Sequence, residues 1–83
     1  MENDYDSKNI DNFKHLLTIY PELYDMMADL SDRECDILKS NLGIDCPISS
    51  LEDIGVHFGL PSERVRQIRN KAIRRLLVRI QLS

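Results

Sequence analysis

The fold is decided by the stretch Leu51-Glu52-Asp53-Ile54-Gly55-Val56-His57-Phe58-Gly59-Leu60-Pro61-Ser62-Glu63-Arg64-Val65-Arg66-Gln67-Ile68. Its apolar residues recur every three or four positions on both sides of a central Gly-Leu-Pro, which is the spacing of amphipathic helices. The residues expected to face the partner helix are Leu51, Ile54 and Phe58 before the turn, and Val65 and Ile68 after it. The stretch therefore predicts two helices that pack against each other across a short turn.

Three residues make this turn specific. Gly59 opens it, because glycine adopts positive φ without steric cost. Leu60 is expected to send its side chain into the core. Gly55 stands in mid-helix, where glycine costs about 1 kcal/mol relative to alanine, so we expect it where the backbones approach most closely. Together these residues predict a helix-turn-helix, with a generic helical hairpin as the alternative.

The helix after the turn has two chemically different sides. Ser62 is positioned to cap it, and its pattern continues to about Leu82. At about 100° per residue, one arc holds the apolar residues Val65, Ile68, Ala72, Ile73, Leu76 and Ile80, with Leu77 beside them. The opposite side holds Glu63, Arg64, Gln67, Lys71 and Arg74, with Arg66 and Asn70 at its flanks. We therefore expect one side to be buried and the other to be exposed.

The polar side has the chemistry that reads duplex DNA. Arginine donates two hydrogen bonds to guanine, glutamine pairs with adenine, glutamate accepts from cytosine, and lysine neutralises phosphate. The N-terminal end of such a helix normally enters the major groove. The predicted DNA-binding residues are Glu63, Arg64, Arg66, Gln67, Asn70, Lys71 and Arg74. The alternative is the solvated face of an ordinary amphipathic helix.

Charge is strongly segregated along the chain. The net charge is −3 and the isoelectric point is about 5.2, which alone would argue against a nucleic-acid partner. Residues 1–36, however, carry ten acidic and three basic residues, whereas residues 62–83 carry seven basic residues and one acidic residue. A phosphate backbone responds to the field within a Debye length of about 8–10 Å, so the basic segment favours DNA despite the negative total.

The N-terminal part of the chain also has helical spacing. Apolar residues predict a short amphipathic helix over residues 9–20, preceded by polar residues 1–8 that we expect to fray. Proline is suited to the first turn of a helix, so Pro21 ends this pattern and begins a second helix that continues to Leu30.

Caps mark the helices that follow. Ser31 and Glu34 form a capping box, which predicts a third helix that ends at Gly43. Residues 44–49 are predicted to form a loop, and Ser50 begins the fourth helix. No segment alternates with a period of two. The predicted fold class is therefore all-α, a bundle of four to five helices that contains the helix-turn-helix.

Length and composition restrict the function further. Eighty-three residues form one small domain, and no apolar run approaches the roughly 18 residues of a membrane span. The acidic start lacks the features of a secretory signal, so we expect a cytoplasmic protein. His15 and His57 stand alone, and Cys35 and Cys46 lack C-x-x-C spacing. We therefore predict no enzyme, no cofactor and no metal site.

Several strings resemble region 4 of the sigma-70 family, the promoter-specificity subunits of bacterial RNA polymerase. They are Ser50-Leu51-Glu52-Asp53-Ile54-Gly55, Phe58-Gly59-Leu60, Glu63-Arg64-Val65-Arg66-Gln67-Ile68 and Lys71-Ala72-Ile73-Arg74-Arg75-Leu76. The third string is the most specific of them. Upstream, the stretches 30–38 and 42–44 resemble the first half of that region, so the similarity spans about residues 22–77.

The resemblance implies a site and partners. Region 4 reads the minus-35 promoter element through its last helix and docks on the flap of the polymerase β subunit. Carried over by resemblance, the residues that approach bases and nearby phosphates are Glu63, Arg64, Arg66 and Gln67. Lys71 would contact the DNA backbone, and Arg74 would face DNA or a neighbouring activator. We therefore expect a small stand-alone transcription regulator that binds promoter DNA, RNA polymerase or both, with residues 62–80 as its recognition helix.

A protein-interaction module is the alternative interpretation. In this interpretation the region 4-like fold acts as a sigma mimic, a decoy or a bridge on RNA polymerase or another regulator, and it does not read DNA sequence. Pro61 and Ser62 favour this interpretation, because the family usually has threonine and a basic residue there. Arg69 also differs, since the family often has glutamate at that position.

The role of the N-terminal residues is left open by the sequence. We predict an acidic extension with a short amphipathic helix over residues 1–20, followed by the region 4-like domain over residues 21–83. The apolar face of this extension could pack on the core, dock on another regulator, or lie over the basic helix as a phosphate mimic. Residues 9–30 could also form a homodimer or a heteromer.

Overall fold

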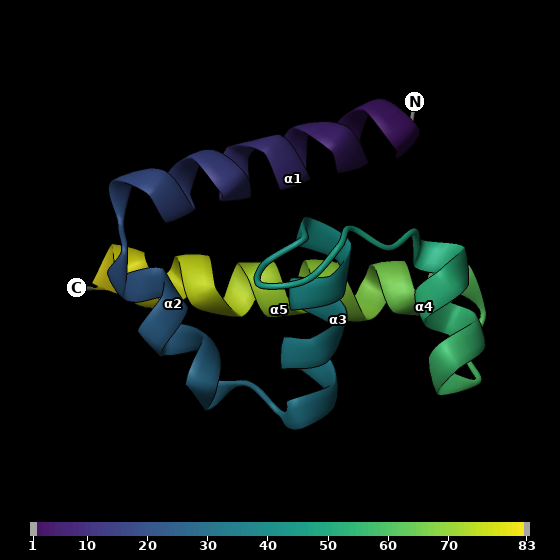
Figure 1. Cartoon of the computed structure of the whole chain (residues 1–83). Coiled ribbons are helices and arrows are strands. Elements are labelled where there is room, and N and C mark those ends of the chain that lie inside the picture. Colours follow the sequence, from purple (N-terminus) through teal and green to yellow (C-terminus); the bar gives the residue numbers. More distant parts are fainter. Residues whose placement is uncertain (1, 83) are drawn as a thin grey trace.

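A computed structural model describes the backbone of residues 2–82 and the side chains of residues 11–80. Its elements in chain order are α1 (Glu2–Ile19), α2 (Glu22–Met26), the 3-10 turn η1 (Met27–Asp29), α3 (Asp32–Leu42), α4 (Leu51–Phe58) and α5 (Ser62–Leu82). Helices are the only regular elements in residues 2–82, so the all-α prediction is confirmed (Figure 1).

Local sequence signals set the ends of the middle helices as predicted. The Ser31 amide donates to the Glu34 carboxylate at 3.1 Å, and the Glu34 amide donates to the Ser31 hydroxyl at 3.2 Å, which completes the capping box of α3. Ser50 caps α4 by accepting from the amide three residues on, at 3.1 Å. Gly43 and Gly59 end α3 and α4 in the left-handed conformation, with φ of 74° and 70°. The elements around the helix-turn-helix are therefore defined by their own caps.

Two N-terminal predictions need correction. The helix expected over residues 9–20 begins at Glu2, so residues 2–8 are helical. This stretch contains neither proline nor glycine, and its acidic residues stand near a helix N-terminus, where the dipole favours negative charge. The second helix does not run unbroken to Leu30. It tightens into η1, and the Leu30 amide donates to the Met27 carbonyl at 3.1 Å as the chain becomes extended.

The start of α5 also differs from the prediction. Ser62 is the first residue of the helix rather than its cap. The Pro61 carbonyl accepts from the amides of Arg64 at 3.0 Å and Val65 at 3.1 Å, which are the first hydrogen bonds of the helix. Proline has a fixed φ that suits this position, and its missing N–H is not needed there.

The core has two parts. The larger cluster joins α1, α2, η1, α3 and α5, and its buried members are Phe13, Leu17, Leu23, Met27, Leu30, Leu38, Leu42, Ala72, Ile73 and Leu76. The smaller cluster belongs to the helix-turn-helix and consists of Ile37, Ile54, Val65 and Ile68, with Leu51, Phe58 and Leu60 packed against it. The apolar arc of α5 is therefore buried as predicted, except that Ile80 is only half-buried.

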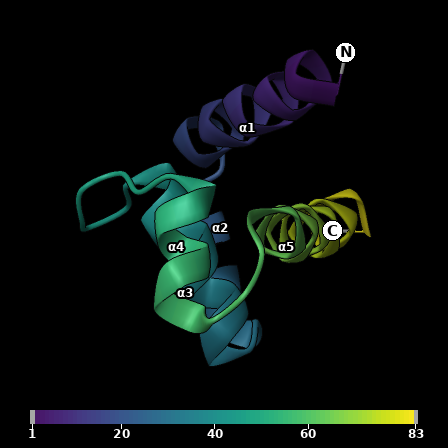
Figure 2. The ribbon, with the colours of Figure 1, turned by 90° about the vertical axis from the view of Figure 1, so that its right-hand side faces the viewer.

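The helices are arranged around α5. In Figure 1, α5 passes behind α3, and α4 crosses it near its beginning. Helix α1 lies on one side of the molecule and the beginning of α3 lies on the opposite side, in both this view and the rotated one (Figure 2). Phe13 and Leu17 of α1 are buried in the larger cluster, so α1 packs on the core, which is one of the alternatives left open by the sequence.

Gly55 lets the turn fold back against α4. The Leu60 amide donates to the Gly55 carbonyl at 2.8 Å. A Cβ atom on Gly55 would lie only 2.4 Å from the Leu60 carbonyl oxygen. A small residue is therefore required at this position as predicted, but its close neighbour is the turn rather than the backbone of the second helix.

Candidate nucleic-acid interface

The outer side of α5 carries all seven predicted DNA-binding residues. Five of them are exposed: Glu63, Arg64, Gln67, Lys71 and Arg74. Arg66 and Asn70 are half-buried at the flanks of this polar face. The division follows the helical angles, because the opposite arc is filled by the core residues of α5. The polar face begins immediately after the turn, at the end of α5 nearest α4 (Figure 1).

Neighbouring residues pair along this face. Nε of Arg66 donates to Glu63 at 3.0 Å, and its Nη2 forms an ion pair with the same carboxylate. Nη1 of Arg64 donates to the Gln67 side-chain oxygen at a long 3.5 Å. Exposed pairs of this kind contribute only about 0.2–1 kcal/mol, so a ligand can displace them at little cost.

A hollow of about 280 Å³ separates this face from the beginning of α3. Its lining residues are Ser31, Arg33, Glu34, Arg64, Gln67, Ile68, Lys71 and Arg74. Four of these side chains are basic and one is acidic, which suits an anion such as a phosphate group. The sequence prediction did not name Arg33, because only the packing of α3 on α5 brings it to this hollow.

Glu34, the acidic residue of the hollow, is held by its neighbours. The Ser31 amide donates to its carboxylate, and Nη1 of Arg75 donates to both oxygens at 3.0 and 3.2 Å. The bond from Ser31 is the main cause of a lowered pKa for Glu34, and Arg75 acts in the same direction against the opposing effect of burial. Arg79 likewise forms an ion pair with Asp29 of η1. The distal half of α5 is thus tied to the acidic part of the chain.

The buried side of α5 contains one charged residue that the sequence prediction did not place. Arg69 is 1% exposed. Its Nη1 donates to Oδ1 of Asn41 on α3 at 2.9 Å, and Nδ2 of Asn41 donates to the Ser49 carbonyl at 3.0 Å. Its Nε and Nη2 donate to Oδ1 of Asn70 at 3.2 and 3.0 Å. This network joins α5 to α3 and to the loop before α4.

Comparison with known proteins places this geometry in a family. The family model described as "Sigma-70, region 4" matches residues 26–76, which include α3, α4 and the whole predicted DNA-binding set. The chain belongs to the sigma-70 region 4 family. This membership supports a role in transcription and a non-enzymatic domain with a helix-turn-helix, as predicted.

Sigma factors are also among the similar curated proteins. The chain is 35% identical over 77 residues to the RNA polymerase sigma factor SigA of Lactococcus lactis subsp. cremoris, which covers 92% of this chain and 21% of that protein. The identity is the same with SigA of Lactococcus lactis subsp. lactis, of which 20% is covered. The region 4 chain therefore spans about a fifth of the length of these relatives. The matched stretch takes in 92% of this chain, so it includes most of α1.

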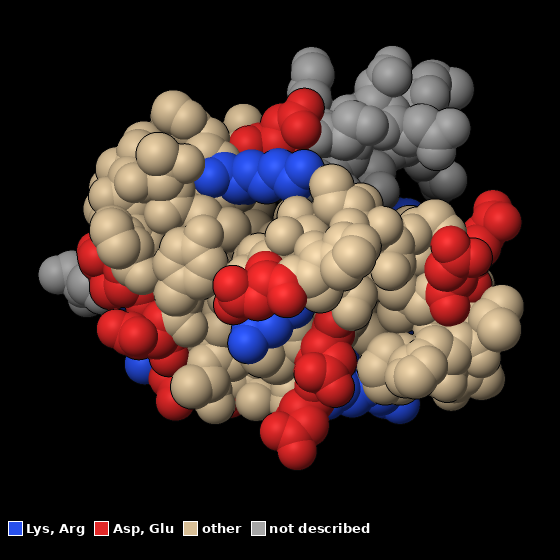
Figure 3. All heavy atoms as spheres, in the orientation of Figure 1, with Lys and Arg blue, Asp and Glu red and all other residues tan. Residues whose placement is uncertain are grey.

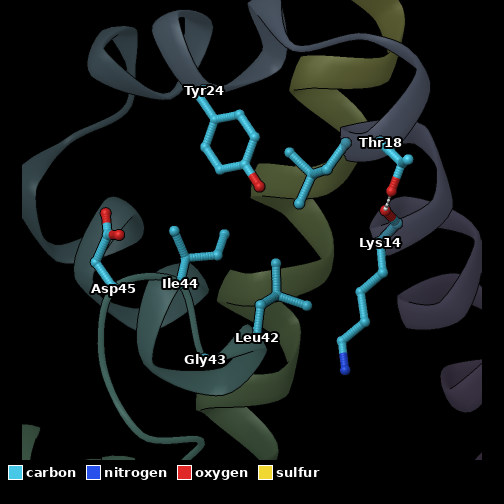
Figure 4. Close-up of a pocket in the computed structure, with 8 residues that line it drawn as sticks. Lys14, Thr18, Tyr24, Leu42, Gly43, Ile44 and Asp45 are labelled. Atoms are coloured by element: carbon cyan, nitrogen blue, oxygen red, sulfur yellow. Dashed lines mark hydrogen bonds between the residues drawn. The ribbon is translucent and has the colours of Figure 1, made fainter.

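The chain has a second hollow, of about 500 Å³, between α1, α2 and the end of α3. Leu17, Leu42 and Ile44 contribute apolar groups to a lining that is otherwise mostly polar, and the Tyr24 ring extends into it (Figure 4). Lys14 and Asp45 stand at its rim on different elements. This hollow lacks the group of basic side chains that lines the first one, so it is less suited to a phosphate group.

The surface around this second hollow is not continuously basic. On the face shown in Figure 3, acidic side chains lie over the regions of α2, α3 and α4, and basic side chains appear singly among them.

Within the part of the chain that the structure describes, no helix is long and apolar enough to cross a membrane. No group of His, Cys, Asp and Glu residues in that part is arranged to hold a metal ion.

Proposed function

We propose that the chain is a small transcription regulator that binds duplex DNA at promoters through the polar face of α5, and acts there on or beside RNA polymerase. The observation that carries this proposal is the convergence of Arg33, Arg64, Lys71 and Arg74 on one hollow beside an exposed, polar helix face. Region 4 membership supports the same assignment, because the match covers every one of these residues.

The proximal half of α5 supplies the base contacts in this proposal. Arg64 and Gln67 are exposed and near the N-terminal end of the helix, which normally enters the major groove. Arginine and glutamine present the hydrogen-bonding groups that distinguish guanine and adenine. Glu63 and Arg66 act as a pair at the same end, where the carboxylate can accept from a cytosine amino group once Arg66 turns to DNA.

Phosphate contacts come from the rest of the polar face and from α3. Lys71 and Arg74 lie one and two turns beyond Gln67 along α5, and Arg33 faces them across the hollow. Lysine and arginine at such positions fix the register of a protein on the duplex and contribute most of its affinity. Asn70 belongs to the edge of this surface, since it is half-buried and its oxygen already accepts from Arg69.

Salt-dependent binding to a fluorescent duplex tests the proposal. Three phosphate contacts, from Arg33, Lys71 and Arg74, give a slope of about −2.7 in a plot of log K against log salt concentration. Lys71→Ala should reduce the slope by about 0.9 and weaken binding to all sequences alike. Lys14→Ala is the matched control, because it removes the same charge from α1, where Lys14 lines the second hollow and not the one beside the polar face. Absence of binding at low salt, or an equal effect of the control, would refute the proposal.

A protein-interaction function without base reading is the second candidate. The hollow beside α1 favours it, together with three exposed side chains near this hollow, those of Ile19 at the end of α1, Tyr20 in the turn that follows and Tyr24 in α2. Such a surface fits RNA polymerase, through its β flap, or another regulator. Footprinting of promoter DNA by polymerase, with and without the chain, separates the two candidates. A shifted footprint that survives Lys71→Ala supports protein contact alone, whereas one that disappears supports DNA contact.

A further inference from the structure

The buried guanidinium of Arg69 holds the side chain of Asn70 by two hydrogen bonds. Arg69 lies in the arc of α5 that faces the core and is 1% exposed. Both its Nε and its Nη2 donate to the same atom, Oδ1 of Asn70. Asn70 itself lies one turn from Arg66, Gln67 and Arg74, at the flank of the polar face. The network therefore connects the core of the domain with the edge of its proposed DNA surface.

In this arrangement both lone pairs of Oδ1 of Asn70 accept hydrogen bonds from Arg69. An amide oxygen has two lone pairs, and two N–H groups of Arg69 point at this one. Asparagine recognises adenine by a pair of hydrogen bonds, in which its oxygen accepts from the N6 amino group and its nitrogen donates to N7. An asparagine whose oxygen is held from the protein side cannot make this pair.

The Arg69 side chain is itself held in place. It is anchored to Oδ1 of Asn41, and Asn41 is anchored in turn to the Ser49 carbonyl. Turning Asn70 outward would take two hydrogen bonds from a charged group that has almost no access to water. Such a loss costs more than the exchange of an exposed hydrogen bond for one to DNA.

We propose that Arg69 is a positioning residue that excludes Asn70 from base recognition. By holding Oδ1 inward, it restricts sequence reading by α5 to the residues nearer the turn and leaves position 70 neutral to base identity. Without Arg69, the terminal torsion of asparagine is free to rotate, and Asn70 gains an adenine preference. The inference rests on the proposed DNA-binding function of the same face.

Selection from a random duplex library tests it, with base preferences measured for four full-length proteins: the natural chain, Asn70→Ala, Arg69→Met and the double variant. Asn70→Ala should leave the preference at every position within two-fold of the natural chain. Arg69→Met should gain a preference for adenine of about five-fold or more at one base pair, and the double variant should lose it again. A purely structural role of Arg69 would lower the melting temperature without creating this preference.

The outcomes separate the two claims. Loss of an adenine preference in Asn70→Ala, or identical profiles in all four proteins, would overturn the inference while leaving DNA binding intact. A natural chain that binds no duplex would refute the proposed function, and the inference would fail with it. Because Arg69 is buried, circular dichroism must first show that Arg69→Met is folded. If it is not, Arg69→Gln is measured in its place. If neither variant folds, the profile of Asn70→Ala alone decides.

Discussion

Replacing Gly55 by alanine should destabilise the domain, although the same change stabilises an ordinary helix. In an exposed helix the substitution gains about 1 kcal/mol, because glycine loses more conformational entropy on folding. Here the new Cβ would lie 2.4 Å from the Leu60 carbonyl oxygen and 3.5 Å from its carbonyl carbon. The close neighbour is backbone, so it cannot swing away as the end of a flexible side chain can. The turn itself has to move.

The cost can be estimated from what the turn would give up. Moving Leu60 weakens its amide bond to the Gly55 carbonyl, a bond of about 1 kcal/mol, and pulls its half-buried side chain from the smaller core cluster. Overpacking adds about 1–3 kcal/mol. After the gain in helix propensity is subtracted, a net loss of about 2–3 kcal/mol remains. In a chain of this size that lowers the melting temperature by about 8–24 °C.

Thermal unfolding followed by circular dichroism measures this loss, with two neighbouring controls. Gly59→Ala keeps open space around its Cβ but retains φ of 70°, so only the left-handed conformation costs free energy, about 1–2 kcal/mol. Val56→Ala changes a side chain that is 84% exposed on the same helix and should be nearly neutral. The expected order of destabilisation is Gly55→Ala, then Gly59→Ala, then Val56→Ala. A melting temperature of Gly55→Ala at or above that of the natural chain would refute the close approach of the turn.

Three further outcomes are expected. Phe13→Ala should cost about 3–5 kcal/mol in denaturant unfolding, because Phe13 is completely buried; a loss no larger than that of the half-buried Phe58→Ala would show that α1 does not pack on the core. Glu34→Gln should lower stability at neutral pH. Since the pKa of Glu34 is lowered in the folded chain, its contribution is present above about pH 4.3 and is lost as the pH falls through the folded pKa. Melting curves of Glu34→Gln should therefore depend less on pH between about 5 and 3, and equal dependence would contradict this assignment. Arg33→Ala should reduce the salt slope of DNA binding by about 0.9 without lowering the melting temperature, and an unchanged slope would remove Arg33 from the interface.

The sequence predicts those parts of the fold that depend on near neighbours. The capping box at Ser31, the cap at Ser50 and the left-handed glycines at 43 and 59 each act within four residues, and all are confirmed. The apolar arc of α5 depends only on helical periodicity, and it is buried as expected. Two of the predictions that needed correction concern weakly patterned segments, the start of α1 and the end of the second helix. The third concerns a local signal, because Ser62 is the first residue of α5 rather than its cap.

The parts that could not be predicted depend on contacts between distant residues. Arg69 bonds Asn41 across 28 positions, and Arg75 bonds Glu34 across 41. One signal was available, because Arg69 follows Val65 by four residues and precedes Ile73 by four, which puts it in the buried arc. A helical wheel thus indicates that Arg69 faces the core, but only the packing of α3 on α5 shows what receives its charge. The same packing brings Arg33 to the candidate site.

Charge that is segregated in the sequence is partly recombined in the fold. Of the basic residues in 62–83, Arg75 and Arg79 form ion pairs with Glu34 and Asp29 from the acidic half, and Arg69 is buried. The positive surface offered to DNA is therefore smaller than the local net charge suggests, and it is concentrated on the proximal and middle turns of α5. Because the salt slope counts only the phosphates that basic side chains neutralise, it should follow the three residues assigned to phosphate, Arg33, Lys71 and Arg74, rather than the seven basic residues of the segment. A slope near about −4.5 corresponds to five contacts. It would mean that Arg75 and Arg79 leave their ion pairs on DNA, and that the acidic half competes with the duplex rather than anchoring α5.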